Sequence, residues 1–273
     1  TGDYDGVNLD YQGVSIADRD GYTSFVNAVT DAMHAQNKKV IVTLPMPFEV
    51  GEFQWDAVNY DWSALGQTAD AIYMEMPLDP TAYGEDEKAN KLISWATGYV
   101  PREKVSALLT ANAIDRIGES YIALPNADAL SHFGELQFVQ GSESVEEGTP
   151  IEVVLSGTAT PLEWDGESQT YKYSYEENGQ THHVWLDNAS GLAARAQQLN
   201  DDQLRGAVVR SLNEANDTPG YATAVANYMG QGDAPQPASA AIIWTVSDQD
   251  ENIVASATGE SLTLYFVPTA DWT

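Results

Sequence analysis

The sequence predicts an α/β protein with a parallel β-sheet, because short apolar runs alternate with segments of helical period along most of the chain. The expected strands span residues 6–11, 39–44, 71–76, 104–110 and 206–211. The expected helices span residues 20–36, 62–68, 88–99, 189–199 and 218–229. Five such strands are visible, whereas a closed barrel of alternating strands and helices has eight.

A long insertion, about residues 112–187, separates the fourth and fifth of these strands. It is longer than a structureless loop, and it contains an acidic break at residues 143–150 and strand-like runs at 135–139, 151–156 and 171–175. The Asn178-Gly179 pair between apolar runs is typical of a β-hairpin. Because loops that follow strands build the substrate face of a barrel, we expect the insertion either to form a wall of the groove or to be purely structural.

The last 40 residues or so differ in character from the rest. Pro235-Gln236-Pro237 predicts a linker over residues 233–239. Alternating runs at 240–246, 252–257 and 261–267 predict strands, which we interpret as the beginning, over residues 240–273, of an immunoglobulin-like β-sandwich that continues beyond this sequence.

Charge and composition exclude several function classes. The chain has 41 acidic and 12 basic residues, and its net charge of -29 opposes nucleic-acid binding. No apolar run approaches the roughly 20 residues of a membrane helix. The acidity, the absence of cysteine and the trailing β-strands together predict a secreted or cell-surface bacterial protein. We expect no cofactor, since the chain has no phosphate-binding loop, zinc spacing or nucleophile elbow.

The segment Asp5-Gly6-Val7-Asn8-Leu9-Asp10-Tyr11-Gln12 carries the chemistry-bearing pattern. As a strand it projects Asn8, Asp10 and Gln12 to one face, because residues two apart point the same way. We expect this strand to be buried, with Val7, Leu9 and Tyr11 packed on the other face.

This segment resembles the D-G-x-D-x-D-x-E signature of family-18 glycoside hydrolases, which cleave chitin and cell-wall N-acetylglucosamine linkages. The resemblance implies catalytic positions at Asp5, Asn8, Asp10 and Gln12. In the family the preceding Asp orients the substrate's acetamido group, which attacks the anomeric carbon, and the final Glu is the general acid. Gln12 occupies that last position, and a carboxamide cannot exchange the proton. Loss of a general acid costs about 10²–10⁴ in rate.

The resemblance extends to about residue 230. Residues 60–67 and the 171–187 hairpin are similar to segments of the bacterial branch of spore-cortex and cell-wall N-acetylglucosaminidases, which Asn8 also favours. The family fold is a (β/α)8 barrel whose signature strand is the fourth. The resemblance therefore implies that residues 1–232 hold strands four to eight, that the first three strand-helix units are absent, and that this is a segment of a longer polypeptide whose other domains are partners of this one.

Other family positions differ from the pattern. The sixth strand usually ends in Met-x-Tyr-Asp, but Met76 and Pro77 replace the Tyr and Asp, and Val209 stands where the eighth strand has a Trp before Arg210. The resemblance implies carbohydrate-contacting positions at Tyr11, Glu75, Met76 and Arg210, with Glu75 also a candidate replacement acid. Gln12 is either an engineered substitution or one of several natural losses, and the joint divergence favours natural loss.

Three further groups have a functional and a structural interpretation. His182 and His183 are adjacent on a strand, so they face opposite sides and do not suit one metal. The acidic turn 248–251 lacks the pattern of a calcium loop. Trp55, Trp62 and Tyr73 are either stacking surfaces or core.

Three functions follow as hypotheses. The first is a catalytically inactive family-18-like module that binds an N-acetylglucosamine-containing polysaccharide. The second is an active hydrolase of chitin or peptidoglycan, with Glu75 as acid or with Glu at position 12 in the parent protein. The third is a scaffold whose groove binds nothing. A bound oligosaccharide in the groove would separate the first from the third, as would a groove filled by protein side chains.

Overall fold

The computed structural model describes residues 4–83, 87–140, 150–199, 203–210, 243–247, 253–258 and 261–265. The predicted helix at 218–229, the linker at 233–239, the acidic turn at 248–251 and most of the acidic break lie outside the described residues. Within the described part, no helix is both long and apolar enough to span a membrane.

A five-stranded parallel sheet forms the framework, and it confirms the five predicted strands. Its order is β1-β2-β5-β6-β14, with every neighbouring pair parallel. The strands are β1 (Gly6–Asp10), β2 (Lys39–Leu44), β5 (Ala71–Glu75), β6 (Val105–Thr110) and β14 (Gly206–Arg210). The strands follow chain order without reversal, as in a barrel wall and unlike a doubly wound sheet. The closed barrel stays a prediction.

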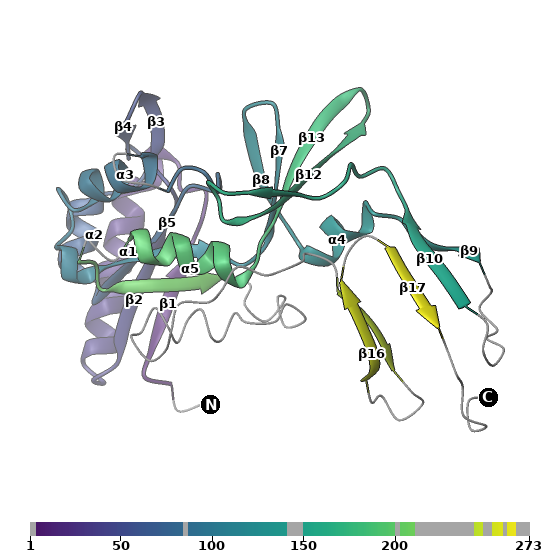
Figure 1. Ribbon diagram of the computed structural model, residues 1–273. Coiled ribbons are helices and arrows are strands. Elements are labelled where there is room, and N and C mark those ends of the chain that lie inside the picture. Colours follow the sequence, from purple (N-terminus) through teal and green to yellow (C-terminus); the bar gives the residue numbers. More distant parts are fainter. Residues whose placement is uncertain are drawn as a thin grey trace.

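Helices follow the strands as predicted. They are α1 (Arg19–His34), α2 (Trp62–Thr68), α3 (Lys88–Ala96) and α5 (Ala189–Gln198), with short 3₁₀ turns at η1 (Ile16–Asp18) and η2 (Arg102–Lys104). The side chains of Asp61 and Asn188 accept backbone hydrogen bonds at the starts of α2 and α5, at 3.0 and 2.7 Å, which satisfies free N–H groups there. Figure 1 shows these helices beside the parallel sheet.

The central strands are buried on both faces, as expected for a parallel sheet covered by helices. Leu44, Ile72 and Met74 have no exposed surface and pack with Leu65 of α2 and Leu92 of α3. The prediction that β1 is buried is wrong. It is an edge strand that pairs only with β2 in the described part, so Val7 and Tyr11 are exposed and Leu9 is half-buried.

The structure explains why the signature segment has glycine at position 6. A Cβ at this position would lie 2.3 Å from the carbonyl oxygen of Lys39, too close for any side chain. The close approach of β1 to β2 therefore requires glycine here.

The insertion forms an antiparallel sheet of its own, in the order β11-β12-β13-β7-β8. Its elements are β7 (Ala113–Ile117), β8 (Ser120–Leu124), α4 (Asn126–Ser131), β11 (Glu163–Asp165), β12 (Thr170–Glu177) and β13 (Gln180–Leu186). Asn178 and Gly179 have φ of 52° and 74°, which is the conformation of a type I′ hairpin turn and confirms the predicted hairpin. The hairpins β7–β8 and β3–β4 (Phe48–Gly51 and Gln54–Asp56) were not predicted.

The remaining strands include the three predicted near the end of the sequence. β15 (Ile243–Ser247) pairs with β16 (Ile253–Thr258), whereas β17 (Ser261–Tyr265) pairs with β10 (Pro150–Ser156), which also pairs with β9 (Glu135–Gln140). Figure 1 shows β9, β10 and β17 at the opposite end of the molecule from the parallel sheet. The last predicted strand thus joins the insertion, and the immunoglobulin-like sandwich stays a prediction.

Candidate functional site

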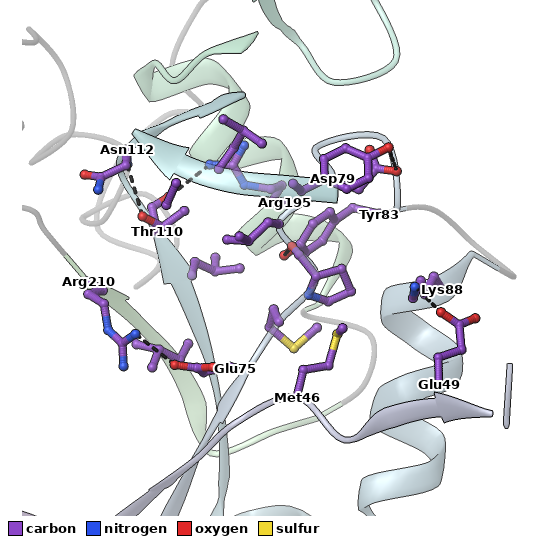
Figure 2. Close-up of a pocket in the computed structure, with 18 of the residues that line it drawn as sticks. Met46, Glu49, Glu75, Asp79, Tyr83, Lys88, Thr110, Asn112, Arg195 and Arg210 are labelled. Atoms are coloured by element: carbon purple, nitrogen blue, oxygen red, sulfur yellow. Dashed lines mark hydrogen bonds and ion pairs between the residues drawn. The ribbon is translucent and has the colours of Figure 1, made fainter. Parts of the chain in front are cut away.

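A cleft of about 800 Å³ lies at the carboxyl ends of β5, β6 and β14. This is the end of a parallel sheet where α/β proteins place their ligand sites. Figure 2 shows its lining side chains, which come from the sheet, from α3 and α5 and from the insertion. Of the predicted residues, Glu75, Met76 and Arg210 line this cleft.

Arg210 links the two edges of the sheet. Its Nη1 donates to Glu75 Oε1 at 2.8 Å and its Nη2 donates to Asp10 Oδ2 at 3.0 Å. Because Arg210 ends one edge strand and Asp10 ends the other, the sheet must curve strongly to bring them together. Figure 2 shows the contact between Arg210 and Glu75.

Gln12 completes this polar group. Its Nε2 donates to Asp10 Oδ1 at 2.6 Å, so both oxygens of the Asp10 carboxylate have a donor. Side-chain exposure is 44% for Arg210 and 40% for Asp10, and exposed ion pairs of this kind contribute only about 0–1 kcal/mol to stability. The group is therefore accessible and can exchange partners with a ligand at low cost.

The other signature residues have separate environments. Asn8 Oδ1 accepts a hydrogen bond from Thr43 Oγ1 of β2 at 3.0 Å. Asp5 precedes β1, at the opposite end from the cleft, and its carbonyl accepts the Lys39 N–H at 2.8 Å. The structure thus brings Asp10 and Gln12 together with Arg210 and Glu75, but not Asp5.

Gln12, which stands at the position of the family's general acid, does not line the cleft itself. Gln12 lines a smaller hollow of about 200 Å³ beside the cleft, and Met46 borders both. Tyr11 lies elsewhere again, stacked on Tyr22 with ring centroids 6.0 Å apart, in a hollow of about 400 Å³.

Two tyrosines that the sequence did not single out support the end of the signature strand. Tyr60 OH donates to the carbonyl of Tyr11 at 3.1 Å and accepts the Val14 N–H at 3.2 Å. Burial, the neighbouring Tyr60 and the charge of Asp10 raise the pKa of Tyr22 to about 12. Tyr22 therefore stays neutral beside Asp10 at physiological pH.

The insertion forms a wall of the cleft, as one of the two predictions had it. Ile114, Tyr121 and Ala123 of β7 and β8 line it. Tyr121 OH donates to Asp79 Oδ2 at 2.8 Å, which joins the insertion to the loop after β5. Burial and this hydrogen bond raise the pKa of Tyr121. Residues 79 and 121 are far apart in the sequence, so no local pattern could have indicated their contact.

Two buried side chains that line the cleft, Arg195 and Tyr83, are already bonded within the protein. Arg195 Nη2 donates to Asp187 Oδ1 at 2.6 Å, and both side chains are buried. Tyr83 OH donates to the carbonyl of Pro77 at 2.8 Å, and burial raises the pKa of Tyr83.

The cleft is nearly balanced in charge, unlike the whole chain. Its lining has four acidic side chains and three basic ones, namely Glu49, Glu75, Asp79 and Glu119 against Lys88, Arg195 and Arg210. Several are paired, including Lys88 with Glu49 at the mouth. A neutral ligand therefore suits this cleft better than a polycation, despite the net charge of -29.

The described residues contain no group of three or more side chains suited to a metal. His182 lies buried against Asp115 at 2.7 Å, whereas His183 is bonded to Ser174 at 2.9 Å. These different partners agree with the prediction that the two histidines face opposite sides of β13.

Comparison with known proteins gives the fold a context. No family model matches the chain. It is 20% identical over 216 residues to a putative sporulation-specific glycosylase, YdhD, of Bacillus subtilis, and the match covers 74% of this chain and 45% of that protein. Among solved structures, a chitinase from Chromobacterium violaceum matches with a TM-score of 0.56 and 23% identity, over 84% of this chain and 67% of that one.

A family-18 N-acetylglucosaminidase from Paenibacillus barengoltzii matches with a TM-score of 0.54 and 12% identity, over 83% of this chain and 70% of that one. The fold is similar to that of family-18 chitinases. The chain spans less than half the length of its curated relative YdhD.

Proposed function

We propose that this chain is the carboxyl-terminal part of a family-18-like barrel that binds an N-acetylglucosamine-containing polysaccharide in the cleft without cleaving it. On this proposal it serves as a carbohydrate-binding module of a larger secreted or cell-surface protein. The observation that carries the proposal is the set of bonds around Asp10, where Gln12 and Arg210 satisfy both carboxylate oxygens.

These bonds argue against hydrolysis for two reasons. The side chain beside Asp10 is an amide, which has no acidic proton to transfer to a leaving oxygen. Glu75, the acid of the cleft that shares Arg210 with Asp10, already accepts a hydrogen bond from that arginine. A substrate-assisted reaction requires a carboxylate to orient the acetamido group and an acid to protonate the leaving group, and here the second of these is missing at its expected position.

Sugar binding remains supported by the cleft itself. It is open, with about 800 Å³ of space, which lies within the roughly 300–1,000 Å³ of typical ligand sites. An open cleft favours a binding module over a pure scaffold. Its balanced charge and its hydroxyl, amide and apolar lining suit a neutral N-acetylated sugar.

An active hydrolase is the second candidate, because Glu75 lines the cleft. For this reaction Glu75 would have to leave Arg210 and carry a proton at the working pH. Several natural losses explain Gln12, Met76 and Val209 together better than one engineered change does.

The test is hydrolysis of a chromogenic di-N-acetylchitobioside and of purified peptidoglycan by the full protein and by its Gln12→Glu and Glu75→Gln variants. In Gln12→Glu two carboxyl groups would lie within hydrogen-bond distance of each other, and a like charge at that distance favours the protonated form of one of them, which would supply the missing acid. We expect no cleavage by the natural chain or by Glu75→Gln. Cleavage by the natural chain that Glu75→Gln abolishes would establish the second candidate, and cleavage by Gln12→Glu alone would show that the amide is the sole defect.

A further inference from the structure

A second hollow, of about 270 Å³, lies among aromatic side chains beside α2 and α3. We call it the tryptophan pocket. Its aromatic members are Trp55, Tyr60, Trp62, Trp95 and Tyr99. It shares no lining residue with the 800 Å³ cleft, although Asp56, Ala57, Tyr60 and Trp62 also border the small hollow beside Gln12.

Trp95 is the centre of this aromatic group. Its ring centroid lies 5.2 Å from that of Trp62 and 5.0 Å from that of Tyr99. Trp62 is buried and belongs to the core, but Tyr99 is 51% exposed and forms part of the rim. The pocket therefore combines a rigid apolar base with an exposed ring, a surface on which a flat apolar ligand face can stack.

Hydrogen-bond donors and acceptors both lie beside the rings. Trp55 is 7% exposed, and its Nε1 has no hydrogen-bond partner among the described residues; Arg19 Nε has none either. Buried donors of this sort are costly when unpaired, and each needs an explanation. Carboxylates of Asp56 and Asp61 supply acceptors beside them. The indole N–H of Trp55 has almost no exposed surface, so a ligand reaches it only if neighbouring side chains shift.

This combination discriminates between ligand classes. An anion would meet Asp56 and Asp61, and a cation would meet the guanidinium of Arg19, which lies 3.5 Å from Asp61. A neutral ring with hydroxyl groups can donate to the carboxylates, accept from Trp55 and Arg19, and lay its apolar face on an aromatic ring. The volume lies just below the roughly 300–1,000 Å³ of sites for larger ligands, which suits one ring.

We propose that the tryptophan pocket is a second carbohydrate site, which holds a single neutral sugar unit independently of the cleft. It goes beyond the function proposed above, because it requires no ligand in the cleft. Two sites on one module would let it hold a polysaccharide at two points, which raises the overall affinity through effective concentration.

Indole resonances of the full ¹⁵N-labelled protein distinguish the two sites. Trp55 Nε1–H reports on the tryptophan pocket. Trp185, whose Nε1 donates to Asp165 at 2.7 Å and whose ring lies 6.5 Å from that of the cleft-wall Tyr121, reports on the cleft. The probes are tri-N-acetylchitotriose and maltotriose as neutral sugars, and choline chloride and inorganic phosphate as ions, each to about 10 mM, tenfold above a Kd of about 1 mM.

We expect a neutral sugar to move the Trp55 resonance in a saturable way and the ions to leave it in place. Tyr99→Ala should raise the Kd measured from the Trp55 shift about tenfold, the equivalent of one good contact. Phe25→Ala should leave this Kd unchanged. It removes an aromatic ring of α1 that is 50% exposed and lies outside the pocket.

Three results would overturn the proposal: no movement of Trp55 with either sugar, saturation by choline or phosphate instead, or equal weakening by Tyr99→Ala and Phe25→Ala. A response of Trp185 without one of Trp55 would leave the cleft proposal standing and reject the second site. The reverse result would support the second site.

Discussion

The two ends of the parallel sheet differ in how their charged groups are used. At the amino ends of β2 and β5, Asp70 accepts hydrogen bonds from Lys39, His34 and the Val40 N–H, each at 2.8 Å. At the carboxyl ends, Asp10 and Glu75 share one exposed arginine, Arg210. Both ends hold paired charges, but only the second group lies beside a cleft.

Lys104, which immediately precedes β6, is a second charged group at the amino end of the sheet. Its Nζ donates to the carbonyls of Gly66, Gln67 and Ala69 at 2.9, 3.1 and 2.8 Å, which closes the end of α2. These bonds lie within the protein and fix helices to strands. The charged groups at the amino end therefore hold the fold together, whereas those at the carboxyl end border an open cleft.

The largest expected effect is at Lys104. Lys104→Met removes three charge-assisted hydrogen bonds and should lower the free energy of unfolding by about 2–3 kcal/mol, measured by urea denaturation. Lys88→Met, at the mouth of the cleft, is the matched control, because its ion pair with Glu49 is partly exposed and should be worth about 0–1 kcal/mol. Equal losses of unfolding free energy in the two variants would contradict the stabilising role assigned to the amino end of the sheet.

The second-largest expected effect is the contribution of Asp70 to stability, which depends on pH. Burial would raise the pKa of Asp70, but the hydrogen bonds from Lys39, His34 and Val40 outweigh it and hold the pKa well below its usual range. A carboxyl group with a lowered folded-state pKa stabilises the protein above its unfolded pKa of about 4, and this stabilisation is lost as the pH falls below that value.

Asp70→Asn should therefore cost about 1–2 kcal/mol at pH 7. The cost should shrink steadily below about pH 4, as followed by urea denaturation across the pH range. A cost that stays constant from pH 7 down to about pH 2 would contradict the role assigned to the Asp70 charge.

The smallest effect on stability is expected at Arg210. Arg210→Met removes two exposed ion pairs and should change the free energy of unfolding by less than about 1 kcal/mol. The same variant should alter sugar binding in the cleft, since it frees Asp10 and Glu75 and leaves their charges unbalanced. A loss of more than about 3 kcal/mol would instead mean that this arginine serves the fold.

The framework was predictable because its signals are local. The apolar runs of β2, β5 and β6 and the Asn178-Gly179 turn each indicate an element from a few adjacent residues. The exposure of Val7 was not predictable, since it depends on which strands flank β1 and not on the composition of β1 itself.

The site was predictable only in part. Asp10, Gln12, Glu75 and Arg210 were named from strand ends and from the family resemblance, and they do meet. The Asp79–Tyr121 contact and the tryptophan pocket join segments that are distant in the sequence. Such contacts depend on how the chain folds around the sheet, which no local pattern encodes.

On the function proposed above, the cleft binds an N-acetylglucosamine polymer without cleaving it. Its most direct test is calorimetric titration of the full protein with tetra-N-acetylchitotetraose, followed by mass spectrometry of the recovered sugar after prolonged incubation. We expect saturable binding that Arg210→Met alters, with the tetrasaccharide recovered intact. Recovery of shorter oligosaccharides, or the absence of binding heat at about 10 mM sugar, would contradict it.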